Sequence, residues 1–380
     1  MFECTAPRPA ARAPGTKEAK IHSPSLDRSA LGPAQLAAGE ARSTRAVAVW
    51  LLACAALVFA MVVVGGVTRL THSGLSIVEW QPIVGTLPPL TDAQWQETFA
   101  KYRETPEYRL VNRGMSLEAF KGIFWWEYFH RLLGRVIGLV FIVPLAWFAL
   151  TRRIDRALAL RLLGIFVLGG LQGAMGWYMV KSGLVDDPRV SHFRLTAHLS
   201  LAFLIFAAML WTALGLLYPR RPEARGAAAA VPLRRLAWWI TGLVAWMIVT
   251  GGFVAGIRAG KAYNTFPLMN GHVVPPEILM LEPWWKNFFY NMATVQFDHR
   301  LGAWALAFLV PWLWLRARRV ALTPRARVSI ALLFAAVAAQ IALGIATLLH
   351  AVPVALGAAH QGVAVLVFAA ALAVNHALAD

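Results

Sequence analysis

Eight long apolar stretches constrain the fold of this chain more than any other feature. They lie near residues 46–67, 129–151, 160–181, 195–217, 235–257, 298–316, 328–350 and 354–376. Each is long enough to cross about 30 Å of hydrocarbon as a helix, at about 1.5 Å per residue. Backbone polar groups inside lipid must be satisfied within the segment, which favours helices. The sequence therefore predicts an all-α integral membrane protein with eight transmembrane helices.

The composition agrees with this fold and explains the basic charge. Only 14% of the residues are charged, whereas soluble proteins average about 25%. The net charge is +17, but the basic residues cluster in loops between the apolar stretches. Membrane topology accounts for such clusters, so nucleic-acid binding is not expected. The two cysteines, Cys4 and Cys54, lie in the polar tail and in the first apolar stretch, which excludes a disulfide framework.

Loop charge predicts the orientation in the membrane. The loops after the second, fourth and sixth stretches are arginine-rich, whereas the intervening loops are mixed in sign. The positive-inside rule then places both termini in the cytoplasm or its equivalent. Residues 1–45 are polar and are expected to form a disordered cytoplasmic tail. A mitochondrial presequence is the alternative for this tail, and its acidic residues Glu3, Glu18, Asp27 and Glu40 count against it.

The chain contains an internal repeat. Five landmarks recur in the same order at offsets of 162 to 187 residues: Gly65-Gly66 and Gly251-Gly252, a Pro-Pro pair, His130-Arg131 and His299-Arg300, Gln172 and Gln340, and His198 and His360. Each half has an even number of helices, so both insert in the same sense. We therefore predict two pseudo-symmetric four-helix bundles, residues 46–217 and 235–380, joined by a linker over 218–234.

Four of the ten histidines stand out because they occupy repeat-related positions. His130, His198, His299 and His360 each lie early in an even-numbered helix, near the outer face. Zinc or copper would require further nitrogen, sulfur or carboxylate ligands that neither half supplies. A haem iron needs two axial ligands, and facing helices of a bundle supply such a pair. We pair His130 with His198, and His299 with His360.

Charged residues beside these histidines suggest further roles. Arg131 and Arg300 are candidates to neutralise haem propionates, with snorkelling to lipid headgroups as the alternative. Glu127 precedes His130 by three residues and shares its helix face, whereas the second half has Gln296 at this position. This asymmetry predicts chemistry in the first half and a fixed cofactor in the second. The alternative is that Glu127 only pairs with an arginine such as Arg131.

The motifs resemble those of the haem A synthase family. The resemblance covers essentially the whole chain beyond residue 45. It rests on Gly65-Gly66-Val67-Thr68-Arg69-Leu70-Thr71, Gly74-Leu75-Ser76, Trp80-Gln81-Pro82, Glu127-Tyr128-Phe129-His130-Arg131, Ala197-His198, Gly252-Phe253-Val254-Ala255-Gly256, Asn264-Thr265-Phe266-Pro267-Leu268-Met269, Gln296-Phe297-Asp298-His299-Arg300 and Ala359-His360-Gln361-Gly362.

The resemblance implies a reaction and assigns the sites. It implies oxidation of the ring methyl of haem O to the formyl group of haem A, by two hydroxylations, for cytochrome oxidase. It implies that His130 and His198 bracket haem O, that His299 and His360 ligate an electron-relaying haem B, and that Glu127 is the acid/base. Some members carry a cysteine pair in the first outer loop. This chain has none there, so it resembles the subgroup without that pair.

The resemblance also sets expectations for location and partners. We expect the bacterial inner membrane, with the mitochondrial inner membrane as the alternative. Expected partners are haem O synthase, cytochrome oxidase assembly factors and the lipid bilayer. Two other functions remain open at this point: a di-haem electron carrier, and a carrier that releases its haem unmodified. The first outer loop, with Trp95, Phe99 and Tyr102, is a candidate to lie on the membrane over the haem edge.

Overall fold

The computed structural model of this chain is helical over most of its length. It describes residues 33–80, 84–185, 187–219 and 231–379. Residues 42–380 form one compact unit. Its long helices are α1 (Pro33–Leu70), α4 (Leu117–Leu150), α5 (Arg156–Lys181), α6 (His192–Leu217), α7 (Val231–Gly256), α9 (Met292–Ala317), α10 (Pro324–Leu349) and α11 (Val354–Ala377). Shorter helices are α2 (Asp92–Arg103), α3 (Pro106–Leu110) and α8 (Asn287–Tyr290), and 3₁₀ turns cover Val84–Thr86, Ala259–Lys261 and Trp284–Lys286.

Seven helices in the described part of the chain are long and apolar enough to cross a membrane, which indicates a multi-pass membrane protein. They are α1 from Arg42, α4, α5, α6, α7, α10 and α11. The helix α9 has 26 residues, as many as α10, but is not among the seven. Its apolar part contains Trp304, Pro311, Trp312 and Trp314, which contribute little hydropathy. The count of eight spans stays a prediction.

Two helices begin earlier than the sequence predicted. The helix α1 begins at Pro33, so residues 33–45 are helical where a disordered tail was expected, and residues 1–32 lie outside the described residues. The helix α4 begins at Leu117 rather than near 129. The hydroxyl of Ser116 caps α4 by accepting a hydrogen bond from the Ala119 amide at 3.2 Å. His130 consequently lies thirteen residues past the start of α4 instead of in its first turns.

The extended start of α4 carries the first outer loop. Trp95, Phe99 and Tyr102 of α2 are buried against Phe120 and Phe124 of α4. The Trp95 and Phe124 rings meet at 4.9 Å, and the Tyr102 and Phe120 rings at 5.0 Å. Aromatic pairs at these separations attract each other beyond their buried area. The aromatic residues of the loop therefore pack on α4, and the placement of the loop on the membrane surface stays a prediction.

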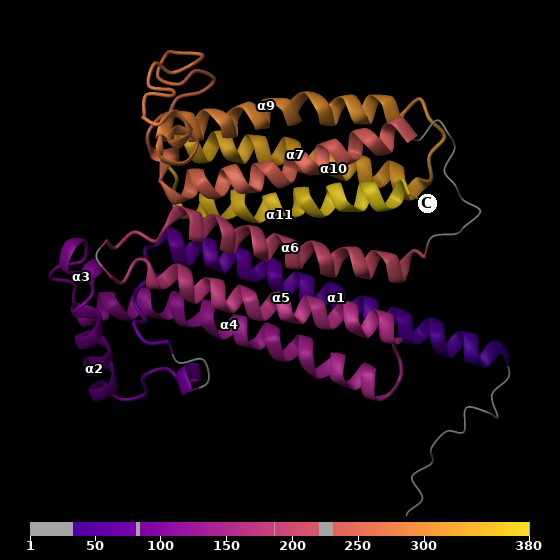
Figure 1. The fold of residues 1–380 in the computed structure, drawn as a ribbon, viewed down its shortest axis with the longest axis horizontal. Helices are drawn as coiled ribbons and strands as arrows, with labels where there is room; N and C mark the ends of the chain where they lie inside the picture. The colour runs from indigo at the N-terminus through magenta and orange to yellow at the C-terminus, as the bar shows by residue number, and fades with distance from the viewer. Residues whose placement is uncertain (1–32, 81–83, 186, 220–230, 380) are drawn as a thin grey trace, which may run out of the picture. The chain divides into compact units, whose positions relative to one another are not determined.

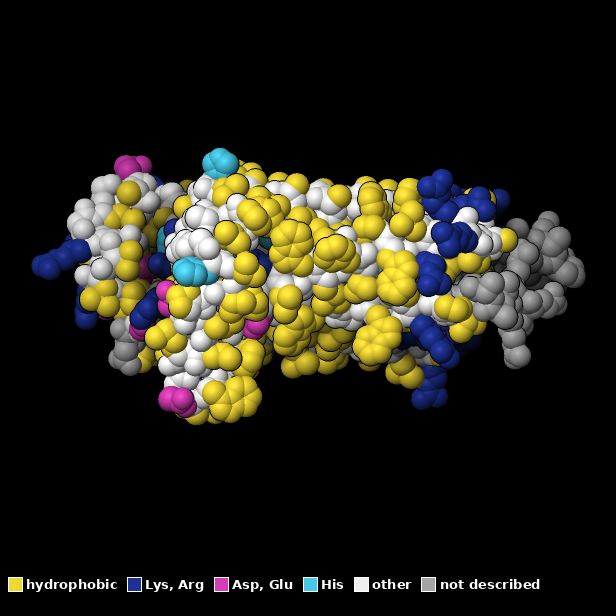
Figure 2. Space-filling model, turned by 90° about the horizontal axis from the view of Figure 1, so that it is seen from above, with side chains coloured by type: hydrophobic (Ala, Val, Ile, Leu, Met, Phe, Trp, Pro, Cys, Tyr) yellow, Lys and Arg dark blue, Asp and Glu magenta, His cyan; other side chains and the backbone are white. Residues whose placement is uncertain are grey.

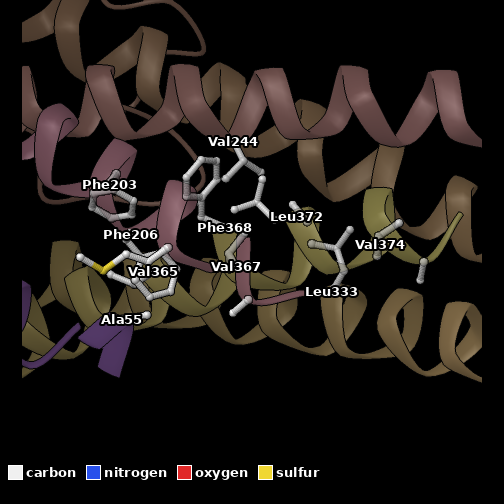
Figure 3. Close-up of a cluster of buried hydrophobic side chains, with 14 of the residues drawn as sticks. Ala55, Phe203, Phe206, Val244, Leu333, Val365, Val367, Phe368, Leu372 and Val374 are labelled. Carbon is white, nitrogen blue, oxygen red and sulfur yellow. The ribbon is translucent and has the colours of Figure 1, made fainter. Parts of the chain in front are cut away.

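The long helices form two groups (Figure 1). One contains α1, α4, α5 and α6, and the other α7, α9, α10 and α11. The indole of Trp50 in α1 donates to the Val140 carbonyl of α4 at 2.9 Å, which ties these two helices together. The groups meet where α6 contacts α7 and α11. Figure 3 shows the buried side chains at this junction, where the rings of Phe203 and Phe368 meet at 5.9 Å. The linker predicted over 218–234 falls partly on residues 220–230, outside the described residues.

Contacts at the outer end of the bundle support the parallel repeat. A guanidinium nitrogen of Arg69 donates to the carbonyl of Ala255, and Arg258 lies 3.4 Å from His72 Nδ1. Each of these pairs is separated by 186 residues, which is the repeat offset of Gly65 and Gly251. A residue near a two-fold axis contacts its own equivalent, so these pairs are expected if such an axis passes between the halves. Two-bundle symmetry itself stays a prediction.

Charge separates the two ends of the bundle. On the face seen in Figure 2, hydrophobic side chains cover the middle, lysines and arginines gather near the end with the C-terminus, and acidic residues and histidines lie toward the other end. This distribution matches the loop charges of the sequence and the positive-inside rule. The orientation in a membrane stays a prediction.

Candidate haem sites

Each of the four predicted histidines packs against a glycine of a neighbouring helix. A β-carbon added to any of these glycines would crowd the imidazole ring, because carbon atoms normally stay about 3.5–4.0 Å apart. Such a β-carbon would lie 3.0 Å from His130 Nε2 at Gly65, 3.0 Å from His198 Cε1 at Gly176, 3.2 Å from His299 Cε1 at Gly251, and 3.0 Å from His360 Cε1 at Gly344. The glycines recur at the repeat offsets, so the same cradle is built four times.

The pairing of the histidines stays a prediction, and the surroundings are compatible with it. His198 is among the charged neighbours of His130, and His360 is among those of His299. The second histidine of each predicted pair, His198 or His360, also contacts a glutamine. Gln172 Nε2 lies 3.3 Å from His198 Nε2, and Gln340 Nε2 lies 3.4 Å from His360 Nε2. Two helices of each group, α4 with α6 and α9 with α11, therefore bring one histidine each to a shared place.

The chemistry of these places fits a haem better than a bare metal ion. Among the described residues, no three His, Cys, Asp or Glu side chains are grouped to hold a metal ion. A zinc or copper site would need such a group. Nδ1 of His198 and His360, and Oε1 of Gln172 and Gln340, are buried without a hydrogen-bond partner. Unpartnered buried polar atoms are costly, and their recurrence in both halves indicates ligand sites. Two imidazoles per site suit a haem iron.

Glu127 is buried and fully engaged by hydrogen bonds. Its Oε2 accepts from the Ser76 hydroxyl at 2.7 Å and from the Ile77 amide at 2.8 Å. Its Oε1 accepts from Arg131 Nη2 at 2.7 Å and Nε at 3.1 Å. The alternative pairing with Arg131 is therefore real, and the carboxylate ties the start of the first outer loop to α4. Its position one helical turn before His130 keeps it beside the first site.

Arg131 and Arg300 bind the outer loops of their own halves. Arg131 donates to the carbonyls of Ile77 at 2.8 Å and Glu79 at 3.1 Å. Arg300 donates to the Tyr263 carbonyl at 2.8 Å and to Gln296 Oε1 at 3.0 Å. The bonds to Glu127, Ile77 and Glu79 use four of the five N–H donors of Arg131, and Nε of Arg300 is buried without a hydrogen-bond partner, so neither guanidinium would have to give up an acceptor to bind a propionate. The propionate role stays a prediction, and the observed role is to hold the loop over the helix.

The second half repeats the first with a neutral side chain in place of the acid. Gln296 occupies the position of Glu127, accepts from Arg300, and donates through Nε2 to the Ala259 carbonyl at 2.8 Å. An amide both accepts and donates in this network, whereas the carboxylate of Glu127 only accepts. Both halves thus have the same arrangement of side chain, arginine and loop carbonyl, and at this position only the first half has an ionisable side chain.

Sequence reasoning missed a second buried acid near the first site. Glu107 of α3 is 4% exposed, and the Tyr102 hydroxyl donates to its Oε2 at 3.4 Å. Burial and the negative charge of Glu127 raise the pKa of Glu107 from 4.5 to about 7. The cradle role of Gly65 and Gly251 was also missed, although both had been noted as repeat landmarks.

The fold and these sites define a class of protein: a helical membrane protein with two repeat-related histidine pairs suited to haem. Residues 48–372 match the family described as cytochrome oxidase assembly protein. A protein of Nitrosospira multiformis named heme A synthase is 63% identical over 335 residues, which cover 87% of this chain and 93% of that protein. Heme A synthases of Nitrosomonas eutropha and Parvibaculum lavamentivorans are 57% and 52% identical, over 86% and 88% of this chain and 92% and 94% of their own lengths. The chain belongs to the haem A synthase family.

Proposed function

We propose that this chain is a haem A synthase that oxidises the ring methyl of haem O to the formyl group of haem A. The observation that carries the proposal is the similarity to heme A synthases over nearly the whole chain, at up to 63% identity among the relatives named above. The two histidine pairs supply what the reaction needs. His130 and His198 bind the iron of the substrate haem O, and His299 and His360 bind a haem B. When bound, the haem B would supply electron transfer for this oxidation.

The residues of the first half position the substrate and handle protons. The conversion of a methyl to a formyl group by two hydroxylations removes four electrons and releases protons. Glu127 is the proposed acid/base, because it is the acidic group nearest in sequence to a substrate ligand and has only a neutral counterpart, Gln296, in the second half. Its four hydrogen bonds fix the carboxylate beside α4. Proton transfer by such a positioned group is worth about 10²–10⁴-fold in rate.

The location and partners follow from the same proposal. The named relatives are bacterial, which supports the bacterial inner membrane with both termini cytoplasmic. A substrate with a farnesyl tail suits a site embedded in lipid. A haem O synthase would supply this substrate, and cytochrome oxidase assembly factors would receive the product.

The first test is product identification. The chain is co-expressed with a haem O source in a host that lacks haem A, and the extracted haems are identified by chromatography and mass. A formyl haem, or its hydroxymethyl precursor, is the expected result. Recovery of unmodified haems B and O alone would contradict the proposal and favour a di-haem electron carrier or a haem carrier. The His130→Ala variant serves as the matched negative control.

The role of Glu127 requires a control for its structural bonds. Glu127→Gln keeps the size of the side chain but removes the acid, whereas Ser76→Ala removes one hydrogen bond and keeps the acid. We expect Glu127→Gln to lower haem A formation by about 10²-fold or more, while Ser76→Ala stays within about tenfold of the wild type. Equal losses in both variants, with less bound haem, would instead assign Glu127 to holding the outer loop.

A further inference from the structure

The hydroxyl of Thr250 contacts one of the four histidines. Thr250 Oγ1 lies 2.8 Å from Nδ1 of His299, across the interface of α7 and α9. Thr250 is 6% exposed, so this contact is shielded from water. The next residue, Gly251, lies against the same ring at Cε1. The His299 ring is therefore held at its edge by a hydroxyl and at Cε1 by a bare glycine backbone.

The hydrogen-bond partners of Thr250 bear on which nitrogen of His299 carries the proton, since either the hydroxyl or the ring can donate across the 2.8 Å contact. A threonine hydroxyl has a single proton to donate and two lone pairs to accept with. Thr250 Oγ1 donates that proton to the Met247 carbonyl at 3.2 Å, one turn earlier in α7. The hydroxyl then accepts from His299 Nδ1–H. Nε2 of His299 is left with its lone pair free, which is the form of imidazole that binds a metal.

The first half carries no hydroxyl at the equivalent sequence position. At the repeat offset of 186 residues, Gly65 corresponds to Gly251, and Val64 therefore corresponds to Thr250. The two rings are also turned differently, because Gly65 faces Nε2 of His130 whereas Gly251 faces Cε1 of His299. His130 and His299 thus each pack against a glycine, but they differ in the side chain that stands beside this glycine, Val64 in the first half and Thr250 in the second.

We propose that Thr250 is a positioning residue that fixes the tautomer and orientation of His299 for the haem of the second half. This inference rests on the proposed function, because it assumes a haem iron between His299 and His360. An Nδ1–H that donates to an acceptor makes the imidazole a more basic ligand. A more basic axial ligand favours the oxidised iron and lowers the reduction potential. The second haem is thereby set apart from the substrate haem, whose ligand His130 has Val64 in place of the hydroxyl.

The test compares the potential of the haem in the second half among threonine variants. The full chain carrying His198→Ala, in which only the second pair remains complete, is loaded with haem B in detergent and titrated with absorption spectroscopy. Thr250→Val copies the residue of the first half, and Thr250→Ser keeps the hydroxyl. Thr212→Val is the matched control, since it removes a helix hydroxyl bonded to the Ala208 carbonyl. We expect a more positive potential in Thr250→Val, and wild-type values in Thr250→Ser and Thr212→Val.

The outcomes separate this inference from the proposed function. An unchanged potential and spectrum in Thr250→Val would overturn the inference, as would a Thr250→Ser variant that behaves like Thr250→Val. Loss of haem from Thr250→Val but not from Thr250→Ser supports it, because only the hydroxyl differs in function. If the parent protein with intact Thr250 binds no haem B at all, the assignment of His299 and His360 in the proposed function is wrong.

Discussion

The Gly176 cradle allows a quantitative test of the first haem site. A methyl group at this position would lie 3.0 Å from Cε1 of His198, about 0.5 Å closer than carbon atoms normally approach. The ring must shift or the α5–α6 contact must open, and overpacking of this kind costs about 1–3 kcal/mol. Since each 1.4 kcal/mol is about tenfold in affinity, Gly176→Ala should weaken haem binding by roughly fivefold to 150-fold.

The helix α5 offers its own control for this prediction. Gly173 lies three residues before Gly176, and a β-carbon there would meet nothing within 4 Å. Both substitutions exchange a helical glycine for alanine, so their intrinsic effects on α5 are alike. Haem affinity is measured by absorption titration of the purified chain in detergent, with His299→Ala in the background so that only the first pair is complete.

The comparison of Gly173→Ala with Gly176→Ala tests whether contact with the His198 ring is what matters for haem binding. Gly173→Ala should bind haem as the parent does, while Gly176→Ala should not. Wild-type affinity in Gly176→Ala would refute the cradle, and equal weakening in both variants would attribute the effect to the helix. In the second half, Gly344→Ala should mirror Gly176→Ala, because its β-carbon would lie 3.0 Å from His360 Cε1.

Two further predictions concern stability. The pKa of Glu107, raised from 4.5 to about 7, means that the folded state holds this proton more tightly than the unfolded state, so stability falls as pH rises from about 4.5 to about 7. Glu107→Gln should remove this loss and gain up to about 3 kcal/mol at pH 8 but little at pH 4, measured by thermal unfolding in detergent; an equal change at both pH values would contradict it. Trp50→Phe should lose about 1 kcal/mol, because the Val140 carbonyl loses its indole donor. An unchanged unfolding temperature would show that this bond contributes nothing.

The helices were predictable because their signals are local. A long apolar run requires a helix wherever the chain enters lipid, and five of the predicted stretches agree with described helices that qualify as spans at both boundaries within a few residues, α5, α6, α7, α10 and α11. The early starts of α1 and α4 were not predictable in this way. The start of α4 is polar enough to look like a loop, and it is helical because Phe120 and Phe124 are buried by α2. The apolar residues Leu117, Phe120, Phe124 and Tyr128 do recur at helical spacing, but charged residues between them kept the segment out of the long apolar stretches, and the element that buries them is not visible in the segment itself.

The candidate haem sites likewise have features that the sequence shows and features that only the tertiary structure shows. The sequence by itself singled out the four histidines as candidates, because a repeat displays the same histidine, glutamine and glycine twice in one order. Only the tertiary structure decided what each of them touches. Glu127 accepts hydrogen bonds from Ser76, Ile77 and Arg131, and Thr250 contacts His299. Most of these partners lie far apart in the sequence, and no sequence pattern pairs them. A repeat can be recognised from the order of residues alone. A hydrogen bond between helices depends on how far each helix is rotated about its axis and where it crosses its neighbour.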